Sequence, residues 1–265
     1  MIKGEAPKDD LDSFKSFLIE SVNWLADVAH ENLATEIILS HLQPGSNWTL
    51  QFLRVGREIQ GISIVTPSGH WFLEAKSEDQ ALTLASLTCR LGLPKRMTCS
   101  GVYSELLRSF VLDIGEITRE HYMDVLICNK AVVTDGPEWA NQDHLDQLAE
   151  YQVAYNQERN TSNVIDVDNI NKNRMAVLIK NSKVASVVKY LGATTNYACI
   201  GGTYTFPQER RKGYASQVIQ FIVSELLKIK PAVHLIVDSD NVAAMGVYKE
   251  VGFKSKGTCY MAYLR

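Results

Sequence analysis

The sequence lacks any paired arrangement of cysteines. Its five cysteines are scattered, include no C-x-x-C pair and are odd in number; they are Cys89, Cys99, Cys128, Cys199 and Cys259. This usage argues against a disulfide framework, because small disulfide-dependent domains carry even numbers of cysteines. We expect most of these residues to be reduced core residues of a cytoplasmic protein, and we expect no metal cofactor.

The sequence also has no long apolar run and no excess of positive charge. No run reaches the length that crosses a membrane, and no charged and then apolar segment at the start is typical of a signal peptide. Lysine and arginine total 27 against 30 aspartates and glutamates, which gives a net charge of −3. We therefore expect neither a membrane nor a nucleic acid among the partners.

The bulk composition is that of a globular protein of more than minimal size. Hydrophobic residues make up 46% and charged residues 22% of the chain, which are ordinary values. A length of 265 residues suggests one large domain or two ordinary ones.

The spacing of apolar residues predicts a repeated order of helices and strands. In the first half we expect two helices within 10–41, further helices at 78–91 and 102–112, and strands at 48–55, 59–65, 70–75, 97–100 and 121–129. In the second half we expect helices at 143–156, 167–174, 216–229 and around Tyr248, and strands at 177–180, 184–190, 197–205, 235–238 and ending near Tyr263. This order predicts two copies of one α/β architecture, with domains at 1–130 and 131–265.

The most informative segment is Arg210-Arg211-Lys212-Gly213-Tyr214-Ala215. It stands between a predicted strand and a predicted helix, whose first backbone N–H groups lack partners and whose dipole favours negative charge. Gly213 can adopt a positive φ and lets a ligand approach the backbone. Three basic side chains add charge. We therefore expect a diphosphate-binding turn; the alternative is a basic helix start on a solvated surface.

A second pattern follows one strand later. Asn241, Ala244, Tyr248, Gly252 and Phe253 form N-x-x-A-x-x-x-Y-x-x-x-G-F. Ala244 and Tyr248 share one helix face, and Gly252 stands where a helix C-cap is expected. Together with R-x-x-G-x-A at residues 210–215, this pattern makes residues 131–265 resemble the GCN5-related N-acetyltransferase (GNAT) superfamily. The run from Tyr204 to Arg210 is similar to a GNAT subgroup whose members carry an extra N-terminal half.

The resemblance implies a fold, a cofactor and site residues. Each half would be a mixed, mostly antiparallel twisted sheet flanked by helices, and the co-substrate would be acetyl-CoA. Tyr204, Thr205 and Phe206 would pair with the pantetheine arm and polarise the thioester carbonyl, until Pro207 ends the pairing. The pyrophosphate would be held by residues Arg210, Arg211, Lys212, Gly213, Tyr214, Ala215 and Ser216.

Two residues of the second pattern would act at the reacting atoms. Tyr248 would be the general acid, since a phenol of ordinary pKa is protonated at neutral pH and can donate to a departing thiolate. The alternative is a core tyrosine. Asn241 would contact the cofactor arm, although it could equally serve as a helix N-cap. No general base is assigned: Glu158, Glu209, His234 and water remain alternatives. Tyr190, Tyr197 and Tyr263 could line the acceptor pocket.

The first half lacks both patterns. After its third strand stand Lys76, Ser77, Glu78 and Asp79, and the two acids would stabilise the next helix start themselves and repel a diphosphate. Tyr103 lies near a helix start without the asparagine pattern. We therefore expect this GNAT-like half to be degenerate, with no CoA site and no catalytic role. It would wall off the substrate site or form a homodimer.

The leading functional hypothesis is transfer of an acetyl group to a primary amine of a small molecule or peptide. Alternatives are a longer acyl group, a hydroxyl acceptor, and a non-catalytic acyl-CoA sensor in which Tyr248 is inert. The acceptor itself cannot be read from the sequence, because it depends on loops that vary freely on one fold.

Overall fold

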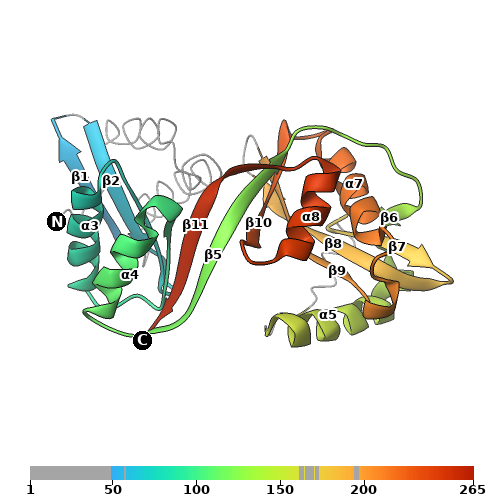
Figure 1. Ribbon diagram of the computed structural model, residues 1–265, viewed down its shortest axis with the longest axis horizontal. Coiled ribbons are helices and arrows are strands. Elements are labelled where there is room, and N and C mark those ends of the chain that lie inside the picture. Colours follow the sequence, from blue (N-terminus) through green and yellow to red (C-terminus); the bar gives the residue numbers. More distant parts are fainter. Residues whose placement is uncertain (1–48, 57, 161–163, 165–169, 171–172, 194–196) are drawn as a thin grey trace. The chain divides into compact units, whose positions relative to one another are not determined.

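The computed structural model describes residues 49–56, 58–160, 164, 170, 173–193 and 197–265 (Figure 1). The helices expected within 10–41 and most of the helix expected at 167–174 lie outside the described residues. The chain divides into two compact units. Unit 1 takes the described part of Met1–Val125 with Asp238–Asp240 and Lys256–Arg265, and unit 2 takes Leu126–Val237 with Asn241–Ser255.

Unit 1 is built on a mixed sheet with strand order β1-β2-β3-β4-β11-β5. These strands are β1 (Thr49–Val55), β2 (Glu58–Val65), β3 (His70–Ala75), β4 (Arg96–Ser100), β5 (Ile117–Cys128) and β11 (Lys254–Leu264). The pairs β1–β2, β2–β3 and β4–β11 are antiparallel, and β3–β4 is parallel. Helix α3 (Glu78–Cys89) makes the crossover between the parallel strands, as such a connection requires. Helix α4 (Ser104–Leu112) follows β4.

The core of unit 1 lies between this sheet and its two helices. Trp71 and Leu73 from β3 are fully buried together with Leu84 of α3, Leu107 of α4 and Tyr260 of β11. The two β3 residues are two apart and so point to one face of the sheet, as the period of a strand dictates. The C-terminal strand thus supplies part of the core of the first unit.

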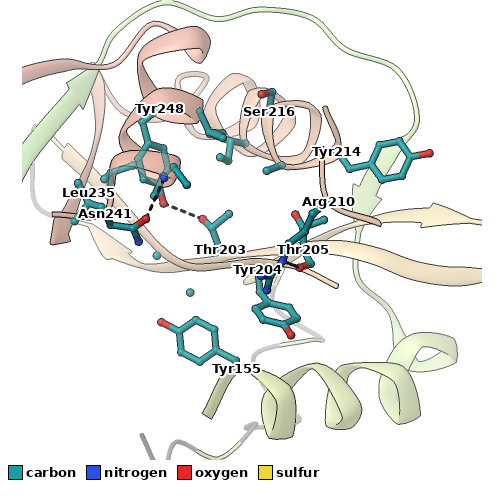
Figure 2. A pocket seen from close by; sticks show the side chains of 18 of the residues that line it. Tyr155, Thr203, Tyr204, Thr205, Arg210, Tyr214, Ser216, Leu235, Asn241 and Tyr248 are labelled. Carbon is teal, nitrogen blue, oxygen red and sulfur yellow. Dashed lines mark hydrogen bonds between the residues drawn. The ribbon is translucent and has the colours of Figure 1, made fainter. Parts of the chain in front are cut away.

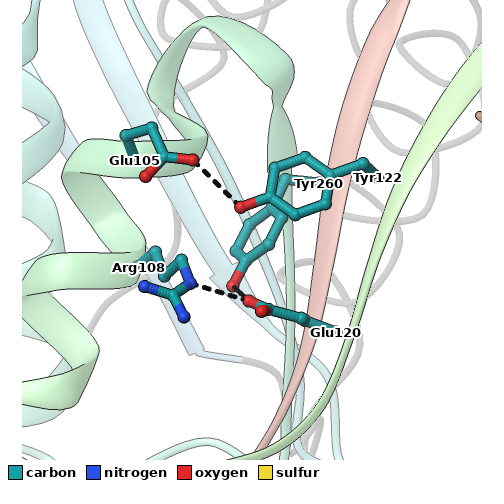
Figure 3. Close-up of polar contacts among 5 residues, drawn as sticks. All are labelled: Glu105, Arg108, Glu120, Tyr122 and Tyr260. Carbon is teal, nitrogen blue, oxygen red and sulfur yellow. Dashed lines mark hydrogen bonds and ion pairs between the residues drawn. The ribbon is translucent and has the colours of Figure 1, made fainter.

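Polar contacts fix α4 to strands β5 and β11 (Figure 3). Arg108 Nε pairs with Glu120 Oε2 at 2.9 Å, and the Tyr260 hydroxyl donates to the same oxygen at 2.7 Å. The hydrogen bonds from Arg108 and Tyr260 lower the pKa of Glu120. The Tyr122 hydroxyl donates to Glu105 Oε1 at 3.0 Å. These groups are used in holding the unit together.

In unit 2 the strand order is β10-β9-β8-β7-β6. Its strands are β6 (Pro137–Trp139), β7 (Met175–Lys180), β8 (Lys183–Ala193), β9 (Tyr197–Thr205) and β10 (Ala232–Asp238). The pair β9–β10 is parallel and the other three pairs are antiparallel. Three helices of unit 2 are α5 (Leu145–Arg159), α7 (Tyr214–Leu226) and α8 (Val242–Val251).

Helices cover both faces of the unit 2 sheet (Figure 1). Successive residues of β7 show this plainly, because Ala176 and Leu178 are buried with residues of α7 and α8, whereas Val177 is buried with Leu148 and Tyr151 of α5. All five are fully buried. A central strand covered on both sides reads as a continuous apolar run, which is the sequence that β7 has.

A β-bulge interrupts the pairing of β8 with β9. Val187 pairs with Tyr204 and Lys189 with Gly201, so that Gly202 and Thr203 stand opposite the single residue between those two partners. Gly202 has a φ of 60°, and a Cβ there would lie 3.0 Å from the Tyr151 hydroxyl oxygen. The bulge therefore requires glycine, and it bends β9 beside the site described below.

The predicted fold class is confirmed, and the differences lie at element ends. Strand β5 begins at Ile117, four residues early, because its first half is partly exposed and carries no continuous apolar run. Strand β10 begins at Ala232, where His234 interrupts the apolar pattern although its side chain is buried. The end of the chain forms one strand, β11. Residues 256–265, which were expected in a domain 131–265, lie in unit 1.

Candidate active site

A cavity of about 700 Å³ opens in unit 2 where the parallel strands β9 and β10 meet three helices (Figure 2). It is lined by β9 from Gly201 onward, the turn before α7, the first turn of α7, the end of β10, one face of α8 and the last turns of α5. The two segments singled out from the sequence therefore lie at one cavity.

The turn before α7 has a backbone suited to binding an anion. Pro207–Glu209 form a short 3-10 helix, after which Arg211 and Gly213 adopt positive φ values of 60° and 76°. Gly213 is the N-cap of α7, and within the described residues no side chain caps this helix start. The next residues, Tyr214, Ala215 and Ser216, include no acid. The first amides of α7 are thus available to a negatively charged group.

The side chain of Arg210 braces this turn. Its Nε donates to the Thr205 carbonyl at 2.9 Å, its Nη2 pairs with Glu158 Oε2 at 2.5 Å, and its guanidinium lies 5.5 Å from the Tyr204 ring centroid. Lys212 Nζ pairs with Glu209 at 2.9 Å. The Arg210–Glu158 pair is half-exposed, so its own contribution to stability is roughly 1 kcal/mol or less. Its geometric effect is to tie the turn to β9 and α5.

Most of the residues predicted to bind the cofactor lie at the cavity. They are Tyr204, Thr205, Arg210, Arg211, Gly213, Tyr214, Ala215, Ser216 and Asn241. Among the described lining residues, Phe206 and Lys212 are missing. The backbone N–H of Phe206 donates to the Ala185 carbonyl at 3.1 Å, so it is already engaged with β8.

Tyr248 and Thr203 form a polar pair on the cavity wall (Figure 2). The Tyr248 hydroxyl donates to Thr203 Oγ1 at 3.3 Å, and its ring packs edge-on against Phe253 with centroids 5.6 Å apart. Tyr248 is 7% exposed, and burial raises its pKa above the ordinary value. The phenol is therefore protonated at neutral pH and points toward the cavity from a rigid helix.

Two more side chains of the wall serve structural contacts. Asn241 is the N-cap of α8, and its Oδ1 accepts a hydrogen bond from the Ala244 N–H at 3.2 Å. The predicted N-cap role is thus confirmed. The Ser216 hydroxyl donates to Glu250 Oε2 at 2.9 Å. The side chain of Ser216 is consequently turned toward α8, and its backbone N–H belongs to the open first turn of α7.

Sequence analysis did not single out every lining residue and named others that lie elsewhere. Thr203, Tyr155 and Glu250 line the cavity without having been singled out; the only local signals were the Gly201-Gly202 pair and the i, i+4 spacing of Tyr151 and Tyr155. Among the described lining residues, none of the three tyrosines suggested for an acceptor pocket occurs: Tyr190, Tyr197 and Tyr263.

The candidate bases have different surroundings. Glu158 and Glu209 line the cavity, but each is ion-paired, with Arg210 and Lys212 respectively. His234 is buried in β10, and burial lowers its pKa to about 4. These contacts do not identify Glu158, Glu209 or His234 as the general base. Within the described residues, no group of three or more histidine, cysteine or acidic side chains is placed to hold a metal ion. None of the helices in that part of the chain is long and apolar enough to cross a membrane.

Comparisons with known proteins identify a family match and a shared fold. Residues 141–253 match the family model described as acetyltransferase (GNAT) family. No curated protein gives a significant match. An acetyltransferase of the GNAT family from Colwellia psychrerythraea shares the fold with a TM-score of 0.58 at 14% identity, over 98% of both chains.

Two further solved structures also span nearly the whole chain. A Drosophila protein aligns with a TM-score of 0.63 at 10% identity, over 97% of this chain and 96% of its own. A tandem GNAT protein from the clavulanic acid biosynthesis pathway aligns with a TM-score of 0.52 at 12% identity, over 96% of this chain and 94% of its own. At these identities the likeness shows the fold.

Proposed function

Because the C-terminal half of the chain belongs to the GNAT superfamily, with residues 141–253 matching its family model, we propose that this protein transfers an acetyl group from acetyl-CoA to a primary amine of a small molecule or a peptide. The observation that carries the proposal is the placement of an uncapped helix start and a buried, protonated phenol at one cavity. The first suits a diphosphate, and the second suits a departing thiolate.

The cofactor site rests on the turn before α7. The backbone N–H groups that follow Gly213 would bind the pyrophosphate, with the exposed Arg211 adding charge from the rim. Arg210 would hold the turn in shape through Thr205 and Glu158 rather than contact phosphate with a free side chain. The end of β9, with its bulge at Gly202, would lie along the pantetheine arm.

The proposed chemistry is direct attack. The amine nitrogen bonds to the thioester carbonyl carbon, the carbon–sulfur bond breaks, and the thiolate takes the proton of the Tyr248 hydroxyl. The surplus proton of the amine leaves to water, since the carboxylates at the cavity are engaged in ion pairs or a hydrogen bond. The Tyr248 phenolate then takes a proton back from water, which restores the acid. A positioned acid of this kind contributes about 10²- to 10⁴-fold to a rate.

Unit 2 alone would bind CoA under this proposal. The predicted absence of a CoA site from the N-terminal half is supported by the capped and acidic start of α3, where Ser77 Oγ accepts from the Gln80 N–H and Glu78 and Asp79 occupy the first turn. We also place the reaction in the cytoplasm, on the ground that all five cysteines are free thiols with buried or half-buried side chains.

The proposal is tested with acetyl-CoA and a panel of amines, by following the release of free thiol and measuring CoA affinity by calorimetry. Turnover with at least one amine supports an enzyme, whereas CoA binding without turnover favours the acyl-CoA sensor. Gly213→Glu should abolish CoA binding, because it places a carboxylate at the helix start. Gly56→Glu is the matched control, since Gly56 also has a positive φ (61°) with no atom within 4 Å of its added Cβ among the described residues.

A further inference from the structure

Tyr155 stands on the opposite side of the cavity from Tyr248. It lies on α5 one turn after Tyr151, and Figure 2 shows its ring across the cavity from Thr203 and Tyr248, with its hydroxyl turned away from Tyr204 into the open space. Burial is the main cause of the raised pKa of Tyr248, and the nearby Tyr155 phenol raises it further. The two phenols therefore approach the same space from two elements.

Aromatic packing fixes the position of the Tyr155 ring. Its centroid lies 5.8 Å from that of Tyr151 and 6.4 Å from that of Tyr204, and the latter two lie 5.9 Å apart. The Tyr151 hydroxyl donates to the Gly202 carbonyl at 2.8 Å, which ties this cluster to the β9 bulge. A ring held on two sides keeps its hydroxyl in one place at little further entropic cost.

The hydroxyl of Tyr155 differs from those of its neighbours in its hydrogen bonding. Tyr151 donates to Gly202 and Tyr248 donates to Thr203, whereas Tyr155 has no hydrogen-bond partner among the residues that the structure describes. A fixed phenol facing a cavity can accept one hydrogen bond and donate another. Its direction makes a ligand in the cavity the natural partner.

Protein cations already lie over the rings of this cluster. Lys189 Nζ is 5.0 Å from the Tyr151 centroid and 6.0 Å from that of Tyr155, and it donates to the neutral Gln152 Oε1 at 2.6 Å. The Arg210 guanidinium lies over Tyr204. Glu158 balances the charge of Arg210, whereas Lys189 donates to a neutral amide and its charge disfavours a second cation beside Tyr155. The charge of Lys189 thus favours an amine that binds without its proton, which is the form that can attack a carbonyl.

We propose that Tyr155 binds the acceptor: its hydroxyl accepts a hydrogen bond from the neutral amine, and its ring with that of Tyr204 forms an apolar wall for the stem that carries the amine. The acceptor class would be monoamines on an aromatic or alkyl stem, as opposed to polycations. This inference rests on the proposed function, since it assigns the acceptor side of the same cavity. Tyr155 would act on the nucleophile while Tyr248 acts on the leaving group.

The test compares Tyr155→Phe with the wild type, using phenylethylamine as a monoamine probe and spermidine as a polycation. We expect the KM for phenylethylamine to rise about tenfold, as loss of one hydrogen bond predicts, with CoA affinity unchanged. The wild type should prefer phenylethylamine over spermidine in kcat/KM. Tyr190→Phe is the matched control, because Tyr190 packs beside the unit 2 core under Arg174 and should leave both constants unchanged.

The inference would be overturned if Tyr155→Phe left the KM for phenylethylamine unchanged, or if it lowered CoA affinity by the same factor as it raised that KM. A wild-type preference for spermidine would also overturn it. If the wild type turns over no amine, the proposed function fails separately. In that case calorimetry of phenylethylamine with the CoA-bound protein decides the inference: weaker binding by Tyr155→Phe supports it, and equal binding or none by the wild type contradicts it.

Discussion

Units 1 and 2 contain the same strand–helix–strand crossover, but the crossover helix begins differently in the two units. In unit 1, α3 joins the parallel strands β3 and β4, and Ser77 Oγ caps its first turn by accepting from the Gln80 N–H at 3.4 Å. In unit 2, α7 joins the parallel strands β9 and β10, and its N-cap is Gly213, with no capping side chain among the described residues. One helix start is satisfied by its own chain, and the other is left for a ligand.

The tyrosines of the following helices show the same contrast. Tyr103, just before α4, donates its hydroxyl to the Ala75 carbonyl at 2.7 Å and is 6% exposed. Tyr248 on α8 donates to the Thr203 side chain at a cavity wall. Burial raises the pKa of Tyr103 to about 12 and also raises that of Tyr248. Both tyrosines are therefore buried and protonated, but the hydroxyl of Tyr103 bonds to the backbone, whereas that of Tyr248 lies at a cavity.

The tyrosine contrast is broken most strongly by Tyr248→Phe. We expect kcat to fall about a thousandfold with CoA affinity retained, because the thiolate loses its proton donor. Stopped-flow thiol release and calorimetry measure the two quantities. Tyr103→Phe is the counterpart, and it should leave kcat unchanged. It should lower the free energy of unfolding by about 1–3 kcal/mol, because the buried Ala75 carbonyl loses the hydrogen bond from the Tyr103 hydroxyl. Equal turnover by Tyr248→Phe and wild type would refute the acid role.

The helix-start contrast is broken by Ala215→Asp. This change copies into the first turn of α7 the acid that Asp79 supplies at the same position of α3. We expect CoA affinity to fall several-hundredfold, because the added carboxylate repels the diphosphate. Asp79→Ala is the matched control and should leave CoA affinity unchanged. Calorimetry gives both values, and undiminished CoA binding by Ala215→Asp would place the diphosphate elsewhere.

Lowering the pH sharpens a comparison between a buried histidine in unit 2 and a half-buried histidine in unit 1. Burial lowers the pKa of His234 in unit 2 to about 4, whereas burial and then Arg96 lower that of His70 in unit 1 to about 3. The unfolded chain takes up a proton below about pH 6.5 while folded His234 does not. Stability is therefore lost as the pH falls from about 6.5 to about 4, by roughly 2 to 3 kcal/mol from His234.

The variant His234→Leu should remove that part of the pH dependence. Urea unfolding at pH 7 and pH 4.5 would show a smaller difference in unfolding free energy for His234→Leu than for the wild type. The absolute stability of the variant does not enter this comparison. An identical pH dependence in the two proteins would mean that folded His234 takes up a proton as readily as His234 in the unfolded chain.

The smallest effect is expected at two glycines. Gly202→Ala adds a Cβ 3.0 Å from the Tyr151 hydroxyl and 3.1 Å from Lys189 Cδ, at a φ of 60°. We expect a loss of about 2 kcal/mol in unfolding free energy, from crowding and from the left-handed backbone. Gly56→Ala in unit 1 has the backbone cost alone and should lose about 1 kcal/mol. Equal losses in thermal unfolding would show that the bulge has room.

The parts of the site that the sequence predicted are those that local chemistry determines. Gly213 at a helix start and Gly252 at a helix end both adopt the predicted positive φ, and Asn241 caps α8 as its spacing indicates. Strand β3 likewise has the predicted bounds, because a short apolar run needs no distant partner to be recognised.

The parts that the sequence missed depend on contacts between distant segments. Thr203 meets Tyr248 across 45 positions, and Tyr155 reaches the cavity because Tyr151 packs under the Gly202 bulge. Phe206 and Lys212, which are predicted to bind the cofactor, are not among the described lining residues. The backbone N–H of Phe206 donates to Ala185 of β8, and Lys212 pairs with Glu209. No local spacing encodes these pairings.

The C-terminal strand ties the order of synthesis to the order of folding. Residues Cys259–Tyr263 of β11 pair with Arg96–Ser100 of β4, and Tyr260, Ala262 and Leu264 belong to the core of unit 1. A ribosome therefore makes all of unit 2 before it supplies the strand that completes unit 1. Until β11 is made, the edge of β4 in unit 1 has no partner strand. A chain cut near residue 130 would leave that edge permanently unpaired.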